Sequence, residues 1–272
     1  MEITQIILFV VVGIIAGTTA GLSGLGGGIF YVPVLLWFLE SESFPNEQIP
    51  VVAVSTSLAI IFVSILNAVR THWKNKNINF KLLPYLLVGG LIGAVLASLL
   101  LAGFDSARFK PALALFQLAW GIKMLMPSNR MGHSTHKGEK KKIFTFLSTG
   151  IFAGAVSAFF GIGGGLITVP LLYWAGRLKM VIAVGTSMMF MVFVVFSGLM
   201  THTIGDGSIG AKGFWIWGTI HMPAFLAITP TAFLFNRFGA QLANKIDGKI
   251  LKRILGVVLV VVGMGSFLRQ AL

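Results

Sequence analysis

The 272-residue sequence contains no cysteine, and charged residues make up only 11% of it. The absence of cysteine excludes disulfide bonds, thiolate catalysis and cysteine-based metal sites. The shortage of charge, together with 56% hydrophobic residues and a mean hydropathy of +0.90, excludes an ordinary soluble domain. We therefore predict a protein embedded in a lipid bilayer.

Acidic residues are also few, and none is predicted to lie inside an apolar segment. All eight fall in predicted loops or termini: Glu2, Glu40, Glu42, Glu47, Asp105, Glu139, Asp206 and Asp247. Cation carriers and carboxylate proton relays usually bury an acid in the membrane, so this distribution favours an anion as the ligand. There is also no metal-ligand spacing and no Ser/His/Asp arrangement, so we expect no metal, no cofactor and no enzymatic activity.

The net charge of +13 comes from lysines and arginines that lie mostly in short loops between apolar runs. This pattern indicates membrane orientation rather than nucleic-acid binding. With the N-terminus placed outside, most of the 21 basic residues fall in inside loops, as the positive-inside rule requires. We predict a multi-pass membrane protein with its basic loops inside, whose first apolar run is retained because no basic segment precedes it.

Ten apolar segments, all expected to be helical, can be placed along the chain. They are residues 6–22, 28–39, 48–69, 82–102, 108–126, 143–160, 165–176, 180–200, 214–235 and 251–269. They divide the chain into a first membrane repeat (1–126), a basic cytoplasmic linker (127–142) and a second membrane repeat (143–272). The predicted fold class is an all-α polytopic membrane protein.

The two halves are related by an internal repeat. Residues 16–37 align without gaps to residues 153–174, and ten of the 22 pairs are identical, five of them glycine. Further matches include 53–57 with 183–187, and His72 with His202. Because each half holds five segments, the second half enters the membrane from the opposite face. We therefore predict an inverted 5+5 repeat.

A glycine-rich loop interrupts each half at the same place. The loops read Gly24-Leu25-Gly26-Gly27-Gly28 and Gly161-Ile162-Gly163-Gly164-Gly165. The segments that follow hold about 12 residues, roughly 18 Å of helix, which is too short for a ~30 Å hydrocarbon core. Each loop is therefore predicted to be the turn of a broken-helix or re-entrant hairpin ending inside the membrane, a feature typical of transporter binding sites.

The chemistry of such loops suits an anion. Consecutive glycines expose backbone N–H groups, and a helix that starts there adds the partial positive charge of its N-terminus. Nearby hydroxyl groups can donate hydrogen bonds without adding charge. The candidate substrate-binding residues are Ser23, Gly24, Gly26, Gly27, Gly28, Ser55, Thr56, Ser57, Gly161, Gly163, Gly164, Gly165, Thr186 and Ser187.

Several of these residues also have a purely structural interpretation. Gly17 and Gly21 have the spacing of a helix-packing motif, and serine or threonine inside a helix often bonds only its own backbone. Trp37 and Trp174 are expected to be interface anchors. His221, within an apolar span, is the best candidate for proton coupling, followed by His72 and His202 at segment ends; a structural role is the alternative for all three.

The paired glycine motif, followed by Ala53-Val54-Ser55-Thr56-Ser57 and Val184-Gly185-Thr186-Ser187, resembles the TauE/SafE sulfite exporter family along essentially the whole chain. The resemblance implies a permease for sulfite, sulfonates or related organosulfur anions in the cytoplasmic membrane. The second copy departs from the first at Phe160, where Ser23 would be expected, and at Ala158, which replaces Gly21. The two loops therefore cannot contribute equally if Ser23 contacts the substrate.

We expect a secondary transporter that binds a small sulfur-containing anion near the midplane and works by alternating access. An uncoupled anion channel and a non-transporting membrane scaffold are the alternatives. The expected partners are the small anion and the lipid bilayer.

Overall fold

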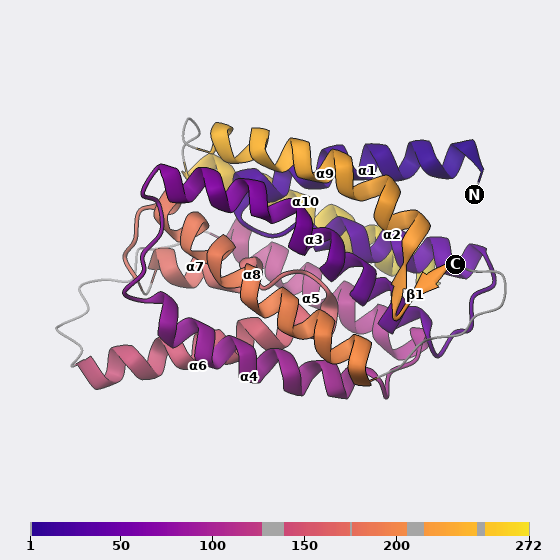
Figure 1. Ribbon diagram of the computed structural model, residues 1–272, viewed down its shortest axis with the longest axis horizontal. Coiled ribbons are helices and arrows are strands. Elements are labelled where there is room, and N and C mark those ends of the chain that lie inside the picture. Colours follow the sequence, from indigo (N-terminus) through magenta and orange to yellow (C-terminus); the bar gives the residue numbers. More distant parts are fainter. Residues whose placement is uncertain (1, 127–138, 175, 206–214, 244–247, 272) are drawn as a thin grey trace.

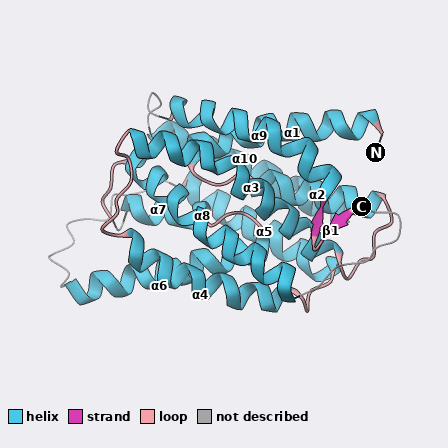
Figure 2. Ribbon diagram, in the orientation of Figure 1, coloured by secondary structure: helices cyan, strands magenta, loops and turns pink. Residues whose placement is uncertain are grey.

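The structure is a computed structural model that describes residues 2–126, 139–174, 176–205, 215–243 and 248–271. Its helices are α1 (Ile3–Ser23), α2 (Gly28–Ser41), α3 (Ile49–Lys74), α4 (Leu83–Leu101), α5 (Ser106–Leu125), α6 (Glu139–Phe160), α7 (Gly165–Trp174), α8 (Met180–Gly205), α9 (Met222–Leu242) and α10 (Gly248–Ala271). Two short strands, β1 (Ile216–Trp217) and β2 (Ile220–His221), form an antiparallel hairpin. Figure 2 shows how completely helices dominate the described chain.

Within the described residues, five helical segments are long and apolar enough to cross a bilayer. They are α1, α3, α4, residues 143–160 of α6, and α8. Large apolar side chains also cover the outside of the molecule; Ile204 is 79% exposed and Leu99 is 59% exposed. An apolar exterior around a packed interior is stable only in lipid, so the fold is that of a multi-pass helical membrane protein.

The prediction that every segment is helical was wrong between residues 215 and 221. The strands β1 and β2 occupy this stretch, with Gly218 at φ +62° in the turn between them. Helix α9 begins only at Met222 and continues to Leu242, beyond the predicted end at 235. The apolar side chains of Trp215 and Trp217 made this stretch resemble the start of a membrane helix, although both are exposed.

Two further expectations change at element ends. Helix α6 begins at Glu139, so the last four residues of the predicted linker are helical, and residues 127–138 lie outside the described part. Glu40 lies in the last turn of α2 rather than in a loop. Its half-buried carboxylate forms an ion pair with Lys110 of α5 and accepts a hydrogen bond from the Ser106 hydroxyl at 2.9 Å.

Helices from the two halves pack in an exchanged arrangement. In Figure 1, α1 lies beside α9 along the upper edge and α4 lies beside α6 along the lower edge, with α3 and α8 between these pairs. Helix α3 also packs on α9, and α8 packs on α4. The packed pairs match between the halves. When α1, α3 and α9 are replaced by their counterparts α6, α8 and α4, the α1–α9 pair becomes α6–α4 and the α3–α9 pair becomes α8–α4.

Small residues allow the close packing of the α1–α9 pair. A Cβ added at Gly17 would lie 2.7 Å from the Ala232 carbonyl oxygen, and one added at Gly21 would overlap that of Asn236. In the α4–α6 pair, a Cβ at Gly154, the counterpart of Gly17, would overlap the carbonyl of Gly90. The helix-packing interpretation of Gly17 and Gly21 therefore describes their contacts.

Figure 1 also shows the directions of the two repeats. Helix α1 begins at the right-hand end of the view, beside the marked N-terminus, whereas α6 begins at the left-hand end. Each repeat continues through its glycine loop into a short helix that turns back the way it came. These helices are α2 with 14 residues and α7 with 10 residues.

Candidate functional site

The two glycine loops meet each other inside the protein. A Cβ added at Gly28 would overlap the carbonyl oxygen of Gly161, and a Cβ added at Gly165 would overlap that of Gly24. These two contacts are reciprocal, and all four residues are buried. The first turns of α2 and α7 begin at this junction, so two helix N-termini converge in the interior of the molecule.

Both loops adopt the same backbone conformation. The φ angles are +71°, +85° and +82° at Gly24, Gly26 and Gly27, and +67°, +91° and +75° at Gly161, Gly163 and Gly164. Side-chain-bearing residues rarely adopt positive φ. Glycine is thus required at Gly27 and Gly164, immediately before α2 and α7, by the backbone as well as by the lack of space.

The serines of α3 and α8 support the loops differently. The Ser57 hydroxyl donates to the Gly161 carbonyl oxygen at 2.8 Å. Its counterpart Ser187 shares a hydrogen bond with the hydroxyl of Thr168 on α7, and Thr168 also donates to the Gly164 carbonyl at 3.1 Å. The sequence repeat is therefore not matched by a repeat of these polar contacts.

The threonines one position earlier hold segments that precede α9 and α4. The Thr56 hydroxyl oxygen accepts from the backbone N–H of His221, and that of Thr186 accepts from the backbone N–H of Asn79, each at 2.9 Å. The side chains of His221 and Asn79 in turn accept N–H groups near the starts of α9 and α4. These matched contacts anchor both helix starts to the centre of the bundle.

The two remaining predicted hydroxyls, those of Ser23 and Ser55, differ in their hydrogen bonding. Ser23 is the last residue of α1; its hydroxyl donates to the Thr19 carbonyl and accepts from the Leu25 N–H at 3.3 Å. The Ser55 hydroxyl is fully buried and has no hydrogen-bond partner among the described residues. Of the predicted hydroxyls in the described chain, Ser55 is thus the one that has no hydrogen-bond partner within the protein.

The three candidate histidines are all buried but occupy different surroundings. His221 caps α9 through Nδ1, and its ring stacks edge-on against Phe38 with the centroids 5.4 Å apart. Nε2 of His202 lies 3.1 Å from the Ala158 carbonyl oxygen. Within the described ranges, neither ring nitrogen of His72 has a partner. His72 and His202 both lie in the last turn of their helices, as predicted.

Two side chains of α5 contact both short helices, and sequence reasoning missed them. The amide of Gln117 donates to the Ile29 carbonyl at 3.3 Å, and the indole N–H of Trp120 donates to the Leu166 carbonyl at 2.7 Å. In an α-helix these carbonyls would accept from residues 33 and 170, but both are prolines and have no N–H. The paired prolines were the signal that could have led to these donors.

Tyr31 is a second residue that sequence reasoning missed. It lies in the first turn of α2, is fully buried, and its hydroxyl has no hydrogen-bond partner in the part of the chain that the structure describes. The ring folds back over the start of its own helix, with the hydroxyl oxygen 3.0 Å from where a Gly27 Cβ would lie. The signal was a difference within the repeat, because Thr168 occupies the matching position.

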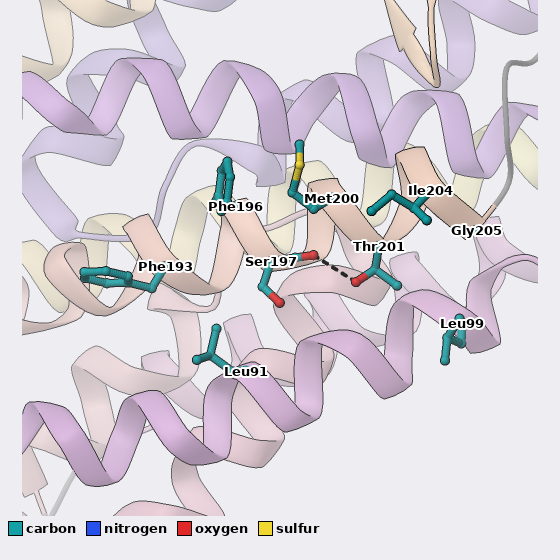
Figure 3. A pocket seen from close by; sticks show the side chains of 9 residues that line it. All are labelled: Leu91, Leu99, Phe193, Phe196, Ser197, Met200, Thr201, Ile204 and Gly205. Carbon is teal, nitrogen blue, oxygen red and sulfur yellow. Dashed lines mark hydrogen bonds between the residues drawn. The ribbon is translucent and has the colours of Figure 1, made fainter.

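One surface hollow lies away from the loops. Figure 3 shows this hollow of about 500 Å³ between α4 and α8, lined mainly by apolar side chains such as Leu91, Phe193 and Met200. The Thr201 hydroxyl there donates to the Ser197 carbonyl at 2.9 Å. Such a surface suits lipid tails rather than an anion.

Another hollow, of about 680 Å³, is more polar. It is lined by residues of α1, α2, α5 and α10, including Pro33, Leu113 and the Glu40–Lys110 ion pair. Pro33 and Leu113 are each one helical turn from the Gln117–Ile29 hydrogen bond. This hollow therefore approaches the start of α2 along the face that α5 covers.

Ten helices with two broken hairpins that meet in the interior define a polytopic helical membrane protein with the architecture of a transporter. The chain belongs to the sulfite exporter TauE/SafE family, whose model matches residues 9–265. This is a family of membrane transporters.

Curated relatives cover nearly the whole chain. The chain is 28% identical to "Probable membrane transporter protein YunE" of Bacillus subtilis over 94% of this chain and 95% of the relative. A probable membrane transporter protein of Haemophilus influenzae is 28% identical over 98% and 99%. One from Xylella fastidiosa is 30% identical over 70% of each chain. No solved structure matches the chain.

Proposed function

We propose that this protein is a secondary transporter for small sulfur-containing oxyanions such as sulfite or organosulfonates. The observation that carries the proposal is the meeting of the two glycine loops, with the N-termini of α2 and α7, in the buried centre of the molecule. Helix N-termini favour negative charge, and their effect is larger where water is excluded. The family description supports sulfur oxyanions as the substrate class.

Direct contact between the loops supports a carrier rather than an open pore. A channel needs a continuous aqueous path, whereas here the carbonyl of Gly161 packs against Gly28. A carrier instead closes its site on both sides during part of its cycle. The glycines and hydroxyls predicted from the sequence remain our candidate substrate-binding residues, with Ser55 favoured among the hydroxyls, and the three histidines remain candidates for proton coupling.

The packing suggests which parts move during alternating access. Helix α9 packs on α1 and α3, and α4 packs on α6 and α8, so the sequence halves are not separate bodies. We infer that one bundle of α1, α2, α3 and α9 rocks against a second bundle of α4, α6, α7 and α8. Residues 1–126 do not move as a unit in this scheme.

The proposal also includes the orientation of the chain in the membrane. The opposite starting ends of α1 and α6 in Figure 1 and the basic loops support an inverted repeat, with the N-terminus outside the cytoplasmic membrane. The polar hollow beside α2 and α5 then forms the outer approach to the site. Lys110 at this hollow attracts anions when its ion pair with Glu40 opens.

Flux into proteoliposomes tests the proposal. Purified wild-type protein is expected to show saturable counterflow of labelled sulfite. Gly27→Leu and Gly164→Leu are expected to abolish it, while Gly103→Leu is the matched control, because the nearest atom to a Cβ there is the Leu100 carbonyl oxygen at an ordinary 3.7 Å. Normal flux by well-folded loop variants contradicts the proposal, and ohmic single-channel currents favour the pore.

A further inference from the structure

The two helix N-termini at the centre of the protein are not equivalent. Helix α2 has no side-chain cap at its N-terminus, and its first residues, Gly28 and Ile29, are buried. Helix geometry leaves the N–H groups of these residues without a partner inside α2. A buried, uncapped helix start is costly unless a ligand or another group accepts these N–H groups.

The Tyr31 hydroxyl adds a further donor at the same place. It is directed to the Gly27 end of α2 and has no partner within the described chain. An unpaired buried hydroxyl costs free energy, so its presence beside free N–H groups indicates a group that accepts from both. An oxyanion has that chemistry.

The matching start of α7 lacks this free donor. Thr168 stands where Tyr31 stands in the first repeat, and its hydroxyl is already bonded to Ser187 and to the Gly164 carbonyl. Phe160 also replaces Ser23 just before the loop. The hydroxyl matched to Tyr31 is therefore committed to the protein itself. The unpaired hydroxyl beside the α7 loop belongs to another helix: it is that of Ser157 on α6, whose Cβ lies 3.3 Å from where a Gly164 Cβ would be.

Ser57 completes the difference. It donates to the Gly161 carbonyl, which packs against Gly28, and thereby satisfies an acceptor that would otherwise face the start of α2. Its counterpart Ser187 turns to Thr168 instead. The result is one short helix whose first turn carries a free side-chain donor and another whose first turn has its hydroxyl bonded within the protein.

We propose that the protein binds one oxyanion per chain, at the N-terminus of α2, with the Tyr31 hydroxyl as a specificity-determining donor. The inference rests on the proposed transport of small anions and assigns the site to one repeat. The α7 N-terminus then packs against the α2 loop and supports it. A hydrogen bond to an oxyanion contributes roughly ten- to hundred-fold in affinity.

Titration calorimetry of detergent-purified protein with sodium sulfite tests the assignment. The wild type is expected to bind one sulfite per chain. Tyr31→Phe, which removes only the hydroxyl, is expected to bind about ten-fold or more weakly, and Thr168→Val is expected to keep its affinity within a few-fold. Two sulfites per chain, or equal affinities for wild type and Tyr31→Phe, overturn the inference.

Melting temperatures measured without sulfite distinguish a variant that has lost binding from one that is misfolded. Tyr31→Phe removes an unpaired hydroxyl, so its melting temperature in sulfite-free buffer is expected to equal or exceed that of the wild type. Thr168→Val breaks two hydrogen bonds and is expected to melt lower. A Tyr31→Phe protein that melts well below the wild type means that the hydroxyl is bonded within the protein, which contradicts the inference.

A spectroscopic readout follows sulfite binding in the wild-type protein. The sequence has three tyrosines, so protein labelled with 3-fluorotyrosine gives three ¹⁹F signals, and the Tyr31→Phe spectrum assigns one of them. Sulfite is expected to shift the Tyr31 signal selectively; a shift of the others alone refutes the site. If the wild type binds neither sulfite nor methanesulfonate by calorimetry, the proposed function itself fails.

Discussion

The hydrogen bond from Gln117 to the Ile29 carbonyl allows a quantitative test of how the broken helices are held. Pro33 removes the N–H that would normally satisfy this carbonyl, and Gln117 supplies a replacement from α5. Leaving a buried acceptor unpaired costs about 1–3 kcal/mol. Gln117→Leu is therefore expected to lower the free energy of unfolding by about 1–3 kcal/mol through the unpaired Ile29 carbonyl.

The single variant alone is not decisive. Gln117 also carries a buried Oε1 with no partner among the described residues, and removing it recovers free energy of similar size. The change in unfolding free energy for Gln117→Leu can then fall near zero. A double-mutant cycle with Pro33→Ala cancels the Oε1 contribution, because that contribution is the same in both backgrounds.

Pro33→Ala restores an N–H that can bond to Ile29 within α2. In this background Gln117→Leu no longer leaves the carbonyl unpaired, so the cycle should yield a coupling of about 1–3 kcal/mol. Unfolding by denaturant in detergent micelles, followed by circular dichroism at several helix-specific wavelengths, measures the four free energies. Additivity within about 0.5 kcal/mol refutes the argument that the proline and Gln117 act on one carbonyl.

The remaining predictions concern the loops, their supports and the orientation of the chain. Gly165→Ala places a Cβ on the Gly24 carbonyl and is expected to destabilise the protein by about 1–3 kcal/mol or more, whereas Gly265→Ala changes the unfolding free energy little. Ser57→Ala leaves the Gly161 carbonyl unpaired and should cost about 1–3 kcal/mol in the same assay; an unchanged midpoint contradicts its supporting role. Thr56→Val and Thr186→Val each remove the acceptor of one N–H group, so their costs should agree within about 1 kcal/mol if the two anchors are equivalent. Because the chain has no cysteine, Ser41→Cys and Lys76→Cys can report orientation: an impermeant maleimide should label the first in intact cells and the second only after permeabilisation.

The ten helices could be predicted because long apolar runs bounded by polar residues determine where a chain crosses lipid. The burial of both glycine loops was expected from the repeat and from the cost of exposing backbone in lipid, whereas their direct contact is a finding of the structure. The hairpin at residues 216–221 was not predicted, because Trp217 and Ile220 are apolar residues that also occur in membrane helices. Its one local signal, Gly218 between apolar pairs, is weak.

The pairing of helices could not be deduced from composition or periodicity. Gly17 and Gly21 predicted a close helix contact, but the identity of the partner, α9, depends on how the whole bundle packs. Tyr31 and Gln117 escaped notice for another reason. Each departs from the internal repeat, and the matched residues attracted attention instead.

The exchanged packing also bears on how the chain is made. Helix α4 meets α6 soon after synthesis, but α1 must wait until α9 has been inserted, near the end of the chain. Until then the glycine-lined face of α1 has no permanent companion in the membrane. The upper pair in Figure 1 can therefore form only after α9 has been inserted, and a chain that ends after α8 lacks the helix on which α1 packs.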